Sequence, residues 1–225
     1  MKDLELSNHG KQLVEFYKQM ASNGLQRTNG EVVEKPYNDF QLAKFRNIVR
    51  PKLSAPSIKS VLDYGAGGSN WHKQNFDPES GHSAIEFFNL EKITVFEPAR
   101  NLLSKEQSDC VVCMDVLEHV YIADVPKIVE DLFSLSKELL IINVACYKAA
   151  ALLPNGENAH ITVRSPDYWK GLIDCISVKF PKIEVLLICS NSFTSGVVFE
   201  SFKSSDWAQS ESYTVEPKWF SFSAS

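Results

Sequence analysis

The chain has 225 residues, of which 44% are hydrophobic and 23% are charged, and its formal net charge is -5. This composition is typical of a globular protein that can bury a core, and it excludes a disordered or collagen-like chain. The negative charge and the lack of a dense lysine or arginine block make nucleic acid an unlikely main partner, because phosphate contacts supply most non-specific affinity for nucleic acids.

The opening residues, MKDLELSNHGK, lack the apolar core of a signal peptide, and no window of the sequence approaches the ~20 apolar residues of a membrane span. We therefore expect a cytoplasmic protein without membrane contact. The five cysteines are odd in number and mostly lie in apolar runs, which predicts reduced thiols. Cys110 and Cys113 share a CxxC spacing, but on a strand they would face opposite sides, which disfavours a shared metal.

Residues 1–56 are predicted to form a helical segment that packs on the core. Residues 8–22 carry apolar side chains at helical spacing, and Ser7 can cap the helix that they predict. A polar link then leads to a second helical pattern at residues 37–53, which should end near Pro51.

Residues 57–203 have the pattern of an α/β domain with a doubly wound, mostly parallel sheet. Six apolar runs are candidate strands: KSVLDY, KITVFE, DCVVCM, ELLIINVA, IEVLLIC and GVVFESF. Helical patterns at 124–138 and 165–180 separate the third run from the fourth and the fourth from the fifth. Only NSFTSG separates the last two runs, so the last strand should be antiparallel. Residues 204–225 are predicted to be a tail, a lid or an extra edge strand.

A glycine-rich turn follows the first predicted strand, in VLDYGAGGSN at residues 61–70. An acid and glycines in this place favour a nucleotide-like ligand at the carboxyl end of the sheet. A dinucleotide fingerprint would need a third glycine where Asn70 stands, and Glu97 lies 32 residues beyond Gly65 instead of about 20. Both departures disfavour a pyrophosphate ligand. A strand-to-helix corner without any ligand is the structural alternative.

These residues resemble the first motif of the class I S-adenosylmethionine-dependent methyltransferases, an apolar strand followed by an acid and GxGxG. Asp63, Gly65 and Gly67 match the motif, and Ser69 replaces its third glycine. The resemblance implies a Rossmann-like fold and S-adenosylmethionine as cofactor, with both ribose hydroxyls on Glu97. DCVVCMDVLEHV is similar to the fourth-strand motif of the small-molecule branch of these enzymes. The implied cofactor-binding residues are Asp63, Gly65, Ala66, Gly67, Glu97, Pro98, Met114 and Asp115.

The interval between Glu97 and Asp109 is only eleven residues long. The family has a helix, a third strand and an adenine-contacting acid in this interval. We therefore expect the third strand to be reduced or lost, which leaves the adenine site open.

Asp115, Glu118 and His119 follow the third predicted strand at spacing i, i+3, i+4, which would place them on one face of a helix that begins near Asp115. His119 is the predicted base for a hydroxyl acceptor, with Asp115 and His160 assisting, because an ordinary histidine pKa suits proton transfer. The structural alternative is that Asp115 caps the helix, Glu118 adds favourable charge to its first turn and His119 lines the pocket.

The run D-x-x-E-H with a later histidine also resembles the metal-binding E-x-x-E-H of the small-RNA 2'-O-methyltransferases and of some ubiquinone-biosynthesis O-methyltransferases. This resemblance implies a divalent metal held by Asp115, Glu118, His119 and His160. The first ligand is an aspartate where those families have a glutamate, which shortens its reach.

The sequence therefore predicts an S-adenosylmethionine-dependent methyltransferase that acts on oxygen of a small-molecule or saccharide acceptor. One alternative is a cofactor-binding module without transferase activity, which the shortened interval after Glu97 suggests. Another is a metal-assisted RNA 2'-O-methyltransferase, which the D-x-x-E-H run suggests and the acidic charge opposes. The sequence does not indicate an oligomeric state.

Overall fold

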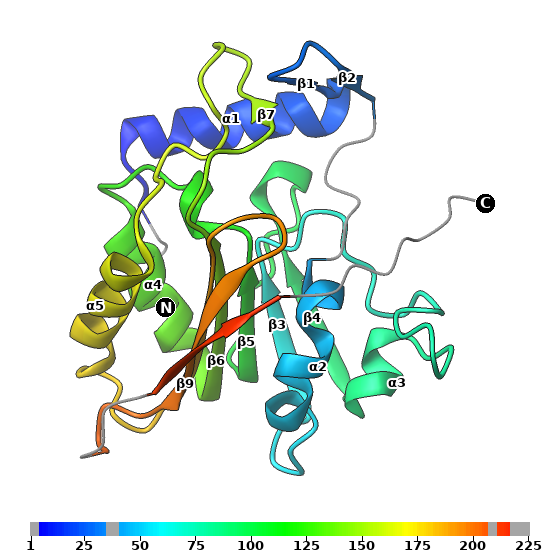
Figure 1. Ribbon diagram of the computed structural model, residues 1–225, viewed down its shortest axis with the longest axis vertical. Helices are drawn as coiled ribbons and strands as arrows, with labels where there is room; N and C mark the ends of the chain where they lie inside the picture. The colour runs from blue at the N-terminus through cyan, green and yellow to red at the C-terminus, as the bar shows by residue number, and fades with distance from the viewer. Residues whose placement is uncertain (1–4, 35–40, 207–210, 217–225) are drawn as a thin grey trace.

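The computed structural model describes residues 5–34, 41–206 and 211–216, and it has an α/β architecture (Figure 1). Its main sheet has seven strands in the order β10-β9-β8-β6-β5-β3-β4. The strands are β3 (Ser60–Tyr64), β4 (Lys92–Phe96), β5 (Ser108–Met114), β6 (Ser136–Ala145), β8 (Glu184–Ser190), β9 (Gly196–Phe202) and β10 (Ser212–Val215). The six strands predicted from apolar runs are all present, and β10 adds an edge strand.

The five strands β4, β3, β5, β6 and β8 pair in parallel, whereas β9 pairs antiparallel with β8 and β10 antiparallel with β9. The predicted antiparallel pairing of GVVFESF is thus confirmed. The parallel part follows the doubly wound order 3-2-1-4-5-6 without its outermost member. Between β4 and β5 the chain forms only a short 3-10 helix, η1 (Pro98–Arg100), and an isolated bridge, as predicted for an interval too short to hold a further strand.

Helices cover both faces of the sheet (Figure 1). On one face, α4 (Val125–Leu135) and α5 (Pro166–Ser177) pack against a core that contains Cys113. On the other face, α2 (Leu42–Leu53) and α3 (Ala84–Phe88) pack against a core that contains Cys110. The two cysteines therefore face opposite sides of β5, as the strand geometry predicted.

The N-terminal helix α1 (Asn8–Asn23) crosses over the carboxyl ends of the strands (Figure 1). Ser7 caps it as predicted, because the Ser7 hydroxyl accepts from the Gly10 N–H at 3.0 Å. The Ser7 N–H and hydroxyl in turn donate to the buried carboxylate of Asp124, at 2.9 and 2.6 Å. This contact just before α4 fixes the start of α1 above the sheet.

A small antiparallel sheet lies beside α1 and has no counterpart in the sequence prediction. It consists of β1 (Leu25–Arg27), β2 (Val32–Val33) and β7 (Ala151–Leu152), in the order β2-β1-β7. It joins the link after α1 to the long loop after β6. Part of the predicted second helix, residues 37–40, lies outside the described residues, and α2 runs through Pro51 to Leu53.

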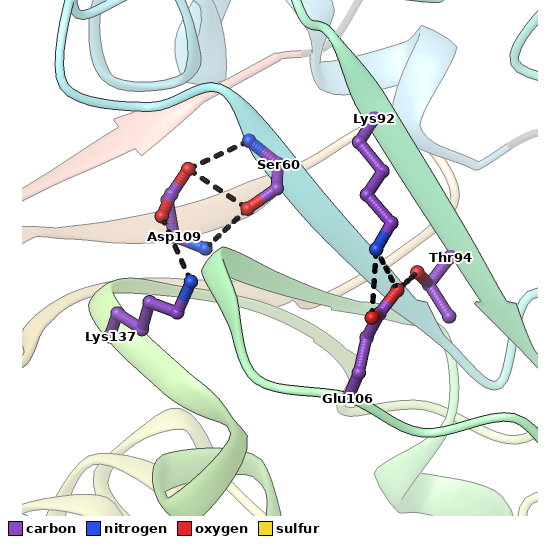
Figure 2. A network of polar contacts seen from close by, with 6 residues as sticks. All are labelled: Ser60, Lys92, Thr94, Glu106, Asp109 and Lys137. Atoms are coloured by element: carbon purple, nitrogen blue, oxygen red, sulfur yellow. Dashed lines mark hydrogen bonds and ion pairs between the residues drawn. The ribbon is translucent and has the colours of Figure 1, made fainter.

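Side-chain contacts hold the segment between β4 and β5 against β4 (Figure 2). Glu106 accepts from Lys92 at 2.8 Å and from the hydroxyl of Thr94, and both of these partners lie on β4. In the same view Asp109, at the start of β5, accepts from the backbone N–H and the hydroxyl of Ser60, both at 2.9 Å. These contacts hold the amino-terminal ends of β3, β4 and β5 together.

Within the described ranges, none of the helices combines the length and the apolarity that crossing a bilayer requires.

Candidate functional site

A cavity of about 680 Å³ lies at the carboxyl ends of β3, β4 and β5, beneath α1. This volume is in the usual range for a small-molecule site. Its wall includes nearly all of the residues that the sequence singled out as cofactor-binding or catalytic: Asp63, Gly65, Ala66, Gly67, Glu97, Pro98, Met114, Asp115, His119 and His160. The glycine turn and the histidines, which are far apart in sequence, therefore share one cavity.

The glycine turn adopts a conformation that disfavours larger residues. Gly65 and Gly67 have φ values of 75° and 56°, in the left-handed region. A Cβ on Gly65 would lie 2.5 Å from Cγ2 of Val116. No helix begins at this turn, because the next helix, α3, starts at Ala84. A helix N-terminus is what usually binds pyrophosphate, so its absence here agrees with the departure from the dinucleotide fingerprint.

Asp63 organises the turn from below. Its Oδ2 accepts from the Ser69 hydroxyl at 2.5 Å and from Trp71 Nε1 at 2.7 Å. Burial raises the pKa of Asp63 to about 6, although both hydrogen bonds act in the opposite direction. Asp63 thus uses one carboxylate oxygen for hydrogen bonds within the protein, and these bonds connect β3 to the residues after the turn.

Glu97 joins the end of β4 to the same turn. One carboxylate oxygen accepts from the Gly67 N–H at 2.7 Å, and the other accepts from the Ala99 N–H at 2.9 Å. A carboxylate can accept about four hydrogen bonds, so both oxygens can accept further donors from a ligand. The carboxylate is therefore held rigidly at the rim of the cavity, with capacity for two hydroxyl groups.

Asp115 does not begin a helix, and that prediction was wrong. Its φ of 61° is left-handed, and its N–H donates to Asn143 of β6 at 3.1 Å. A single 3-10 turn, η2 (Leu117–His119), follows instead, with Val116 at its N-cap and no side-chain cap. The capping alternative for Asp115 is likewise not observed. Aspartate tolerates the left-handed region better than most residues, so the chain can turn sharply there.

The two histidines lie together at the cavity wall, with ring centroids 4.7 Å apart and planes at 83°. His119 Nδ1 is 2.7 Å from the Tyr17 hydroxyl and 3.1 Å from the Ala159 carbonyl oxygen. Burial, assisted by His160, lowers the pKa of His119 to about 4 against the opposing charge of Asp115. The ring is therefore neutral near pH 7 and free to take a proton, but it is a weaker base than the ordinary histidine on which the sequence prediction rested.

Glu118 is fully buried, and the structure places it behind the site instead of at the cavity wall. One of its oxygens accepts from the Ala145 N–H. Burial raises the pKa of Glu118 well above its ordinary value, and the charge of Asp115 raises it further. Its Oε2 has no hydrogen-bond partner among the described residues. If Glu118 is protonated, its carboxyl group can donate a hydrogen bond to Asp115.

Three of the four predicted metal ligands converge. One ligand atom each from Asp115, His119 and His160 lies within 4.8 Å of the others. Glu118 is not part of this group. The convergence does not depend on a helix face, because η2 supplies His119 while His160 comes from the loop between β7 and α5.

The sequence interpretation missed three residues of the site. Tyr17 belongs to the helical pattern of residues 8–22, and its hydroxyl bonds to His119. A buried tyrosine needs a partner for its polar end, and this requirement could have indicated Tyr17 from the sequence. Lys44 of α2 lines the cavity, and burial lowers its pKa although Asp115 opposes this. Trp71 bonds to Asp63. Neither Lys44 nor Trp71 follows a recognisable motif.

Comparisons with protein-family models, curated proteins and solved structures found no match to this chain.

Proposed function

We propose that this protein is an S-adenosylmethionine-dependent methyltransferase that methylates a hydroxyl group of a small-molecule or saccharide acceptor. The observation that carries the proposal is the shared cavity, in which the Gly65 to Gly67 turn and Glu97 face the same space as Asp115, His119 and His160. A site for a nucleoside-like ligand is thereby adjacent to a site for proton transfer.

The residues at the first half of the cavity suit this cofactor. Glu97 lies at the end of β4 and can accept both ribose hydroxyls while it keeps its backbone donors. The left-handed glycines let the backbone approach a ligand closely. Phe96 and Met114 supply apolar surface to the same wall, and Pro98 to Arg100 form its rim where the family has a longer segment.

S-adenosylmethionine supplies an activated methyl group on a sulfonium. Transfer of that methyl group to a hydroxyl oxygen would break the carbon–sulfur bond and release the hydroxyl proton, which a base beside the acceptor would take. Positioning contributes most to such a displacement, since positive charge disappears in it. His119 is neutral near pH 7 and has Tyr17 and Ala159 to fix its ring, so it can take this proton. Side chains of α1, Tyr17 among them, line the same cavity.

The decisive measurement is calorimetry with S-adenosylhomocysteine. We expect binding, and we expect Glu97→Gln to weaken it at least tenfold, because an amide offers one acceptor oxygen instead of two and hydrogen bonds to charged groups contribute about 1.5–3 kcal/mol. Glu91→Gln is the matched control, since Glu91 is exposed and precedes β4 at the opposite end of the strand. A chain that takes up no S-adenosylhomocysteine, or a Glu97→Gln variant that binds as well as Glu91→Gln, would refute the proposal.

A further inference from the structure

Both histidines of the site present the same ring nitrogen to a backbone carbonyl. His160 Nδ1 bonds to the Tyr147 carbonyl oxygen, and His119 Nδ1 lies 3.1 Å from the Ala159 carbonyl oxygen. A carbonyl oxygen only accepts, so Nδ1 must carry the hydrogen in each ring. The Tyr17 hydroxyl fits this assignment, because it donates to the Ala159 oxygen at 3.0 Å and can accept from His119. In the neutral form of each ring, Nε2 is then the nitrogen with the lone pair.

A neutral histidine held through one nitrogen by a carbonyl is the usual state of a metal-binding histidine. We propose that Asp115, His119 and His160 bind a divalent transition-metal ion. Ligand atoms that share one ion at about 2.0–2.2 Å can be at most about 4.4 Å apart. The three ligand atoms here already lie within 4.8 Å of one another, so only small side-chain shifts separate the observed arrangement from a coordinating one.

Glu118 gives an independent reason for a cation at this place. It is 0% exposed, and its Oε2 has no hydrogen-bond partner among the residues that the structure describes. It also lies close enough to Asp115 for the two carboxyl groups to interact directly. A buried oxygen without a partner is costly. A divalent ion on Asp115 would offset that cost, and Glu118 would then orient Asp115 from behind.

The backbone conformation of Asp115 is a further observation that favours a functional site. Its left-handed φ of 61° is an unusual conformation for a residue other than glycine, and such conformations are concentrated at functional sites. The bend turns the chain from β5 into η2 within two residues, so that Asp115 and His119 reach the same point.

The ligand set identifies the class of ion. Two imidazoles and one carboxylate suit Mn²⁺, Fe²⁺, Co²⁺ or Zn²⁺ better than Mg²⁺ or Ca²⁺, which prefer oxygen ligands only. Three protein ligands leave coordination positions open for an acceptor. An acceptor with two oxygens on adjacent carbons fits this best, since both oxygens can bind the ion. The ion would lower the pKa of the bound hydroxyl enough for its proton to leave to solvent, and His119 would then act as a ligand instead of the base. This substrate class rests on the proposed function.

The test is a calorimetric titration of the full chain, after treatment with a chelator, with MnCl₂ and separately with CoCl₂. We expect one ion per chain with a Kd well below about 1 mM. His160→Gln and Asp115→Asn should each weaken manganese binding at least tenfold. His82→Gln is the control, because it alters an exposed histidine in the loop before α3 and should leave the affinity unchanged.

The visible spectrum of the cobalt-loaded chain is a second measurement that needs no variant. Absorption distinct from that of aqueous cobalt supports the site, and an unchanged aqueous spectrum overturns it even where a ligand variant does not fold. Equal manganese affinity in the unmodified chain and in both ligand variants also overturns it. S-adenosylhomocysteine titrated into the metal-free chain tests the proposed function separately: binding there without manganese binding refutes only the metal site, and the reverse result refutes only the methyltransferase.

Discussion

Gly65→Ala tests whether the glycine turn has the geometry described above. Gly65 has a φ of 75°, and a Cβ there would lie 2.5 Å from Cγ2 and 3.0 Å from Cγ1 of Val116. The left-handed conformation costs an L-residue about 1–2 kcal/mol, and forcing a methyl group into packed side chains costs about 1–3 kcal/mol more. We therefore expect Gly65→Ala to lower the free energy of unfolding by about 2–5 kcal/mol and to weaken S-adenosylhomocysteine binding, because the turn must move.

Two further variants separate the two contributions. Gly156→Ala is the matched control, because Gly156 has a φ of 85° but nothing within 4 Å of an added Cβ. It should lose only about 1 kcal/mol. Adding Val116→Ala to Gly65→Ala removes the clashing methyl groups, so the double variant should be more stable than the sum of the single losses by about 1–2 kcal/mol.

Urea unfolding of these three variants and of Val116→Ala alone, all at one pH, gives these differences directly. If Gly65→Ala costs no more than Gly156→Ala, the close approach of Val116 is not a constraint and the account of the turn is wrong. If the double variant shows simple additivity, the cost of Gly65→Ala arises elsewhere.

Two other predictions concern acidic side chains that are buried to different extents. Burial raises the pKa of Asp63 to about 6, so the folded state holds its proton more tightly and the free energy of unfolding should fall by about 2 kcal/mol between pH 4 and pH 7. Asp63→Asn should flatten this decline in urea unfolding across that range, and parallel curves would refute it. Asp109→Ala should lower the free energy of unfolding by about 2–3 kcal/mol, because Asp109 accepts from the backbone N–H groups of Lys59 and Ser60 and from the Ser60 hydroxyl. Glu106→Ala should lower it by less than about 1 kcal/mol, because the lysine partner of Glu106 is exposed. Equal losses at Asp109 and Glu106 in thermal unfolding would contradict this ranking.

The strands could be predicted because each is a buried run of apolar residues bounded by polar segments. β5 and β6 are almost continuously buried, which is what two covered faces impose on parallel strands. The edge elements were harder. β1, β2 and β7 are only two or three residues long, too short for an alternation of polar and apolar residues to be detectable.

The candidate site shows a different limit. The spacing of Asp115, Glu118 and His119 indicates a helix face, but the left-handed bend at Asp115 and the 3-10 turn after it replace that helix. Spacing rules assume a regular backbone, and this segment departs from one at Asp115, whose φ is left-handed although its N–H still bonds to Asn143 of β6. His160 joins the site from 41 positions beyond His119, through loop contacts that no local pattern encodes.

The segment between β4 and β5 holds its place beside the cavity because it is anchored at several points. Glu106 holds its later part along β4, and Lys105 bonds to Asp131 of α4 at 2.7 Å with its ammonium 4.9 Å from the Phe96 ring centre. Glu97, at its start, is fixed by the Gly67 and Ala99 N–H groups. The chain from Glu97 to the start of β5 therefore closes the edge of the sheet with side-chain contacts instead of a strand. These contacts hold the Glu97 carboxylate, on which the proposed cofactor site depends, without a further strand beside β4.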